Sequence, residues 1–94
     1  SISTNVTETF SLKQNYPNPF NPVTNLEFGI AKLGFVSLKV FDVLGKEVAV
    51  LVNEKLTPGS YEVEFSGSRF ASGMYFYKLE ADNFAETKRM IILK

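Results

Sequence analysis

The sequence contains no cysteine, no histidine and no tryptophan. Without cysteine there is no disulfide and no thiolate zinc site, and without histidine there is no imidazole base and no histidine-ligated metal. The usual catalytic triads are thereby excluded, and nothing marks a particular serine as activated for a serine–lysine dyad. We therefore expect no enzymatic activity, no catalytic residue, no cofactor and no metal site.

The sequence also has no excess of charge of one sign and no long apolar run. Ten basic and ten acidic side chains give a formal net charge of zero, which argues against nucleic acid or an anionic membrane as a partner. No apolar run reaches the length of about 18 residues that a membrane span requires. We therefore expect no membrane span.

The 94 residues suffice for one domain with one core, because 45% of them are apolar and 14% are aromatic. Residues 1–8 are polar and featureless, so we interpret them as a linker remnant, and residues 9–94 as a single β-sandwich domain. Because no basic and apolar leader precedes Ser1, we expect a module cut from a longer protein.

Three of the four prolines are concentrated between Asn15 and Pro22. Each proline fixes its own φ near about −65° and pushes the preceding residue toward an extended conformation. The segment, called the proline loop below, is therefore neither a helix nor a central strand.

Two interpretations of the proline loop compete. Its restricted φ angles lower the entropy cost of binding, so Tyr16 and Phe20 would suit a recognition surface. Alternatively, Phe20 closes one end of the core while Asn15, Asn18 and Asn21 bond the loop's own backbone. The residues alone favour closure.

Elsewhere apolar residues alternate with polar ones in short runs separated by glycine, proline, aspartate and asparagine, which predicts strands and turns. No helical period occurs. Met74–Ala81 is almost continuously apolar, which is typical of a central strand buried on both faces. Phe41 interrupts a polar face, so we expect a loop or a partner to cover it. The strands are expected at residues 9–13, 26–30, 36–41, 47–52, 61–65, 74–81 and 89–94.

This pattern predicts an all-β fold, an immunoglobulin-like antiparallel β-sandwich of about seven strands. Glu62 and Glu64 share one strand face at a spacing compatible with a carboxylate pair, but a solvated face is the simpler interpretation. Asp42 and Asp82 could each contribute to a calcium site, yet neither lies in an acidic cluster.

Tyr75 and Tyr77 also share a strand face. Paired tyrosines can stack sugars, which would suit a carbohydrate-binding module. Packing within the sandwich is favoured, because aromatic pairs on sandwich strands usually contact the core or a neighbouring strand.

Several stretches, in this order, carry a resemblance to a known family. They are Leu12–Pro22 with its Asn-Tyr-Pro-Asn-Pro-Phe-Asn-Pro block, Val40–Gly45, Pro58–Tyr61, Ala71–Tyr77 and the basic-ended Lys88–Lys94. From Leu12 onward the chain resembles the type A C-terminal sorting domain of the type IX (Por) secretion system.

The resemblance implies an immunoglobulin-like sandwich at the C-terminus of an exported cargo protein, covalently attached on its N-terminal side. It implies passage through the periplasm of a Bacteroidetes-type bacterium to the outer-membrane surface or the medium. The implied partners are outer-membrane type IX export components and a sortase-like peptidase. The signature or partner-recognition positions are Asn15, Tyr16, Pro17, Asn18, Pro19, Phe20, Asn21, Pro22, Gly59, Tyr61, Gly73, Tyr75, Lys88, Arg89 and Lys94.

The C-terminal run has two interpretations as well. In one, Met90, Ile92 and Leu93 fill the last strand and Lys94 is its solvated end. In the other, an edge strand ending at a free carboxylate is captured by a receptor through strand addition or end recognition. A passive spacer of a multidomain surface enzyme is the remaining alternative, although we expect more protein to follow a spacer.

Overall fold

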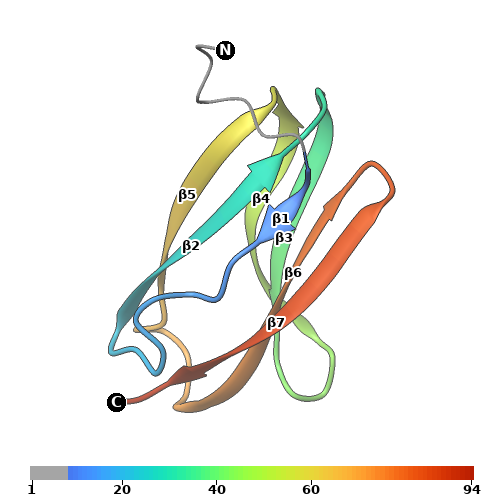
Figure 1. The fold of residues 1–94 in the computed structure, drawn as a ribbon. Coiled ribbons are helices and arrows are strands. Elements are labelled where there is room, and N and C mark those ends of the chain that lie inside the picture. The colour runs from blue at the N-terminus through green and yellow to red at the C-terminus, as the bar shows by residue number, and fades with distance from the viewer. Residues whose placement is uncertain (1–8) are drawn as a thin grey trace.

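The computed structural model describes residues 9–94, and within them the chain forms seven β-strands and no helix (Figure 1). The predicted all-β class and number of strands are confirmed. The strands are β1 (Ser11–Leu12), β2 (Val23–Ile30), β3 (Gly34–Phe41), β4 (Glu47–Leu56), β5 (Gly59–Ser66), β6 (Gly73–Ala81) and β7 (Phe84–Ile92).

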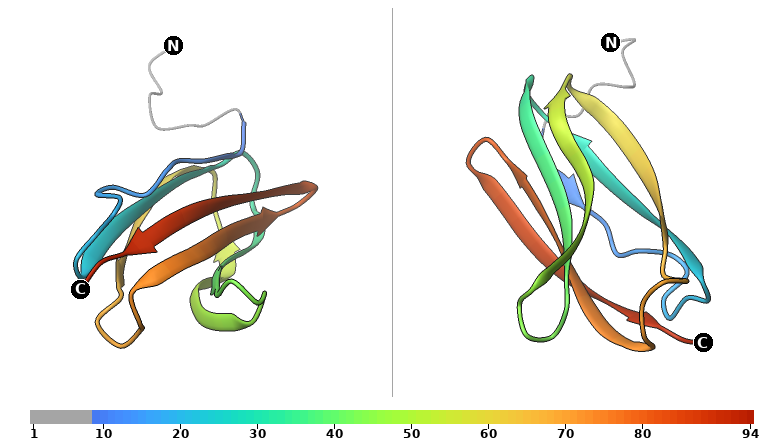
Figure 2. Two further views of the ribbon diagram at one scale, coloured as in Figure 1. Left: turned by 90° about the horizontal axis from the view of Figure 1, so that it is seen from below. Right: turned by 180° about the vertical axis from the view of Figure 1, so that it is seen from behind.

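The strands form two antiparallel sheets packed face to face, as Figure 2 shows. One sheet has the order β1-β2-β5 and the other the order β4-β3-β6-β7. This is the immunoglobulin-like sandwich that was predicted. The strand β4 pairs with β3 in the four-stranded sheet, whereas β5 belongs to the other sheet. Both β4 and β7 are edge strands of the four-stranded sheet.

Two turns follow from their residue types. The Asp42 carboxylate accepts hydrogen bonds from the N–H groups of Leu44 and Lys46, both at 2.9 Å, and closes the turn between β3 and β4. Gly45 supplies the positive φ of 85° that this turn needs. The Asp82-Asn83 turn joins β6 to β7, as predicted.

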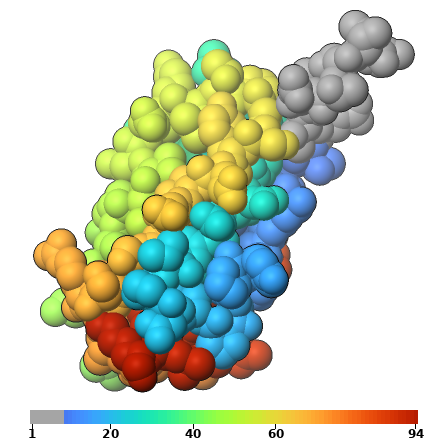
Figure 3. Space-filling view, turned by 90° about the vertical axis from the view of Figure 1, so that its left-hand side faces the viewer, coloured from blue at the N-terminus to red at the C-terminus, as the bar shows by residue number. Residues whose placement is uncertain are grey.

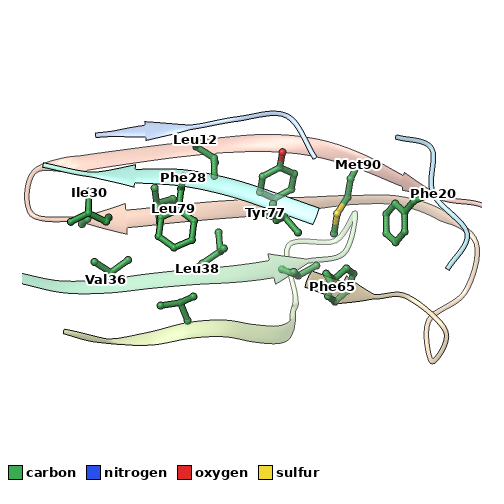
Figure 4. Packing of buried hydrophobic residues seen from close by; sticks show 14 of the residues in the cluster. Leu12, Phe20, Phe28, Ile30, Val36, Leu38, Phe65, Tyr77, Leu79 and Met90 are labelled. Carbon is green, nitrogen blue, oxygen red and sulfur yellow. The ribbon is translucent and has the colours of Figure 1, made fainter. Parts of the chain in front are cut away.

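The core lies between the inner faces of the sheets, and the alternation of apolar residues places it there (Figure 4). Tyr77 occupies its middle, and Phe20 lies at one end beside Met90 and Phe65. The buried apolar residues are Leu12, Phe20, Leu26, Phe28, Ile30, Val36, Leu38, Val40, Val52, Phe65, Tyr77, Leu79, Ala81, Met90 and Ile92.

Two predictions about strands are wrong. The predicted burial of Met74–Ala81 on both faces does not hold, because β6 is central but alternates between buried residues and exposed ones such as Met74 and Glu80. The last strand begins at Phe84 and ends at Ile92, and its first half was not predicted because Glu86 and Lys88 occupy the partly buried positions where an apolar residue is expected. Leu93 lies beyond it and is 52% exposed.

Candidate recognition site

The proline loop begins as a continuation of the three-stranded sheet. After β1, the N–H of Lys13 donates to the carbonyl of Glu27 at 2.9 Å. Tyr16 and Asn25 then exchange two backbone hydrogen bonds of 3.0 and 2.9 Å in an antiparallel bridge. The loop is therefore fixed to β2 before its first proline.

The loop then crosses to the other sheet and pairs with β7. The N–H of Phe20 donates to the carbonyl of Ile91 at 3.0 Å, and the N–H of Leu93 donates to the carbonyl of Phe20 at 2.9 Å. The Asn18 side-chain oxygen accepts the N–H of Ile91 at 3.0 Å. In Figure 3 the loop lies directly against the C-terminal residues. Two segments more than 70 residues apart in the sequence thus form one surface.

Phe20 closes one end of the core, as predicted. Its side chain is 2% exposed and makes an edge contact with the ring of Phe65, at a centroid distance of 6.1 Å. Gly67 permits this packing: a Cβ there would lie 2.9 Å from Cδ1 of Ile92 and 3.2 Å from Cε2 of Phe20. The N–H of Gly67 also donates to the carbonyl of Pro22 at 2.7 Å, which fixes the end of the loop.

Tyr77 ties the loop to the four-stranded sheet. Its ring is 0% exposed, and Figure 4 shows its hydroxyl turned toward the N-terminal segment. The hydroxyl donates to the carbonyl of Lys13 and accepts the N–H of Asn15, both at 2.7 Å. Burial raises the pKa of Tyr77 to about 12, and the hydrogen bond from Asn15 opposes that rise.

Asn15 organises the interior of the loop. Its side-chain amide donates to the carbonyl of Pro17 at 3.1 Å and to the hydroxyl of Thr24 at 3.0 Å. The Thr24 hydroxyl donates in turn to the same carbonyl at 2.8 Å. The prediction for Asn15 is confirmed, whereas Asn18 bonds to β7 instead of the loop and Asn21 is exposed. The peptide bonds before Pro17, Pro19 and Pro22 are cis.

The signature positions of the loop therefore separate into two sides. Asn15 and Phe20 face inward and are buried. The remaining six face outward, and Tyr16 is 79% exposed although its backbone N–H and carbonyl both bond to Asn25. The exposed positions are Tyr16, Pro17, Asn18, Pro19, Asn21 and Pro22.

Gly73 and Tyr75 form a tyrosine corner at the start of β6. The Tyr75 hydroxyl donates to the carbonyl of Ala71 at 2.9 Å, and Gly73 has a φ of 146° that suits glycine. The Tyr75 ring contacts Phe70 at a centroid distance of 6.0 Å. Because the Tyr77 ring is buried, the two tyrosines form no exposed platform for sugars, and the packing interpretation is confirmed.

Gly59 and Tyr61 repeat the same geometry at the start of β5. The Tyr61 hydroxyl donates to the carbonyl of Thr57 at 2.6 Å, again four residues back, and Gly59 has a φ of 152°. The ring of Tyr61 stacks on Phe28. Sequence reasoning treated the two Gly-x-Tyr motifs separately, although their common spacing was a signal that one local structure occurs twice.

The basic positions near the C-terminus have different environments. Lys88 pairs with Glu86 at 3.2 Å, and the Lys94 ammonium donates to the carbonyl of Ser68 at 2.7 Å. The Arg89 side chain is exposed. Lys94 is thus attached to the loop between β5 and β6, and only Arg89 projects freely from β7 within the described residues.

The other candidates carry no site. Glu62 and Glu64 lie on a solvated face of β5, as predicted, and the Asp42 carboxylate is used by its own turn. Within residues 9–94 no group of three or more potential metal ligands occurs. The same residues include no helix that could cross a membrane. Phe41 is half-buried beside its hairpin loop.

The sandwich, the two tyrosine corners and the bridged proline loop define a small β-module. Residues 14–93 match the family model described as the secretion system C-terminal sorting domain. The chain belongs to this family, which serves the type IX (Por) route, and is a C-terminal sorting signal. Comparison with curated proteins and with solved structures finds no significant match.

Proposed function

We propose that the outer-membrane type IX export machinery reads this domain through the surface that the proline loop and the end of β7 form together. The cargo is attached on the N-terminal side, passes through the periplasm, and reaches the cell surface or the medium. A sortase-like peptidase then removes the domain. The observation that supports this proposal is the direct pairing of the loop with β7 at Phe20 and Ile91.

The pairing explains how two distant signature stretches act as one signal. The outward residue Asn18 lines the same groove as Arg89 on this surface, while Asn15 and Phe20 hold the loop in place. Gly59, Tyr61, Gly73 and Tyr75 support the sandwich and act indirectly. The geometry leaves strand addition no access to β7 beyond Arg89, because the proline loop already occupies that edge.

The test is a reporter fused before Ser1 and expressed in a type IX-competent bacterium. We expect the reporter at the surface or in the medium with the domain removed. Retention of the intact fusion in the periplasm contradicts the proposal. Removal of Ile91–Lys94 is a poor test, because it also removes Ile92 from the core and the partners of Phe20.

The sharper variant is Lys94→Ala, which alters the end of the chain without touching the core. If the terminal cation is read, export falls while the melting temperature stays close to that of the original chain. Lys46→Ala, in the exposed turn between β3 and β4, is the matched control for loss of a surface ammonium. Equal export of both variants would remove Lys94 from the recognition surface.

A further inference from the structure

A shallow groove lies beside the point where the proline loop meets β7. Met74 and Ile91 are both partly exposed there and provide an apolar surface. Gln14, Asn18, Lys88 and Arg89 also line it. We call this the β7 groove.

The backbone of β7 is open along one half of its outer edge. Ile91 directs both its N–H and its carbonyl toward the proline loop, and the carbonyl of Arg89 accepts the Gln14 amide at 2.6 Å. The period of two along a strand gives Thr87 and Ala85 the same outward direction. Within residues 9–94 no backbone group bonds to these two from that side.

The charge of the groove has one sign. Among the described residues no carboxylate lines it, and Arg89 forms no ion pair. The outer face of the three-stranded sheet differs, because Glu27 and Glu62 lie directly across from each other there and Lys13 pairs with Glu27. An acidic segment therefore matches the β7 groove better than that other face.

We propose that an extended acidic segment of the export receptor adds as a strand to the open half of β7, from Ala85 to Arg89. Its backbone bonds to the outward groups of Thr87, and the carboxylates on its face that continues the Arg89 face of β7 pair with Arg89. The identity of the partner as an export component rests on the proposed function. The proline loop marks where the added strand must stop, because it occupies the edge beyond Arg89.

The backbone part of the proposal is tested with Thr87→Pro. Proline removes the outward N–H and leaves the β6–β7 ladder intact, since that N–H points away from β6. The probe is a fluorescein-labelled octapeptide alternating valine with glutamate, titrated into the purified 94-residue chain. We expect saturable binding that Thr87→Pro weakens about fivefold or more, the effect of one lost hydrogen bond. Thr87→Val, which keeps the N–H, should bind more tightly than Thr87→Pro.

The charge part is tested with Arg89→Glu and with a matched octapeptide that alternates valine with lysine. The original chain should prefer the glutamate peptide, and Arg89→Glu should reverse that preference. Amide chemical shifts should change at Ala85, Thr87 and Arg89 on titration. Circular dichroism and melting curves check that each variant is folded. If Thr87→Pro does not fold, Arg89→Glu still tests the proposal.

The outcomes separate this inference from the proposed function. If the original fusion is exported and both Thr87→Pro and Arg89→Glu are exported equally well, the sorting function stands and the groove is not its recognition site. If the fusion is retained but the glutamate peptide binds at β7, the proposed function fails and the groove remains a binding site. Binding of neither peptide, or self-association of the chain through β7, overturns the inference.

Discussion

The two edges of the four-stranded sheet are protected by different means. Along β7 the proline loop and the preceding Gln14 supply backbone and side-chain partners from Arg89 to Leu93. Along β4 no segment of residues 9–94 covers the edge, and two register shifts opposite β3 interrupt its regular pairing instead. Irregular pairing hinders edge-to-edge association and requires no additional segment of chain to cover the edge.

The difference indicates what the signature residues are for. An irregular strand needs no particular sequence elsewhere, whereas a covering loop needs residues that bond to its own interior, to the core and to the strand it covers. Asn15, Phe20 and Asn18 perform these three tasks. We infer that much of the signature is required to hold the loop on β7, and that recognition uses the outward side that remains.

The largest expected effect comes from Phe20→Ala, which removes the side chain that closes the core beside the β7 edge. We expect the free energy of unfolding to fall by about 3–5 kcal/mol, as for other buried phenylalanines. Urea denaturation followed by circular dichroism measures it. Loss of export at unchanged stability would show instead that the machinery reads Phe20 directly.

Tyr77→Phe should have the next largest effect. It leaves the Lys13 carbonyl and the Asn15 N–H without their partner, at a cost of about 1–3 kcal/mol. The same hydroxyl makes the loop sensitive to alkali. Its pKa is raised from 10.0 to about 12 in the folded chain, so its contribution is complete below pH 10 and is lost as the pH rises toward 12.

The pH prediction is checked by unfolding curves between pH 9 and pH 12, with Tyr77→Phe as the control. The loss of stability over this interval should be smaller in the variant, because the three other tyrosines remain in both proteins. Equal losses would show that Tyr77 does not dominate the response. Deprotonation removes the bond to the Lys13 carbonyl, because a phenolate has no proton to donate, whereas the phenolate still accepts the N–H of Asn15.

Asn18→Ala should have a smaller effect, because its bond to Ile91 lies at the surface. We expect a loss of about 0.5–1.5 kcal/mol, the net value of one hydrogen bond. The diagnostic measurement is amide exchange at Ile91, which should accelerate while exchange at buried Leu79 follows the global change alone. An unchanged rate at Ile91 would mean that the loop does not protect this edge.

Val50→Thr on β4 should change stability least. Val50 is 47% exposed and belongs to the edge that no segment of residues 9–94 covers, so the expected change is within about 0.5 kcal/mol. Thermal melting measures it. A change as large as that of Tyr77→Phe would contradict the idea that the two edges differ in how they are stabilised.

Sequence patterns were sufficient for much of the fold. Alternation located the strands, because a residue such as Leu38 or Tyr77 must face the core when its neighbours face water. The same rule failed at the start of β7, where Glu86 and Lys88 occupy semi-buried positions near an edge and neutralise each other. The boundary of β2 was also missed, because Thr24 is polar yet buried by its bonds to the loop.

The candidate site was predicted only in part. The place of Phe20 in the core could be predicted, because its side chain is apolar and the prolines around it restrict the conformation of the loop. Its pairing with β7 could not, because contacts between residues 70 positions apart leave no local pattern. The position of Gly67 was missed for the same reason: its lack of a side chain matters only once Phe20 and Ile92 are placed beside it.

The two tyrosine corners have a consequence for engineering. In each, the tyrosine hydroxyl bonds to a main-chain carbonyl, that of Thr57 or Ala71. The side chains of these two residues are therefore free to vary. Only the glycine and the tyrosine of each motif are constrained, and the residue between them, Ser60 or Met74, is exposed. Met74→Cys would therefore place a fluorophore or spin label in the β7 groove, which Met74 lines, without disturbing the corner that supports it.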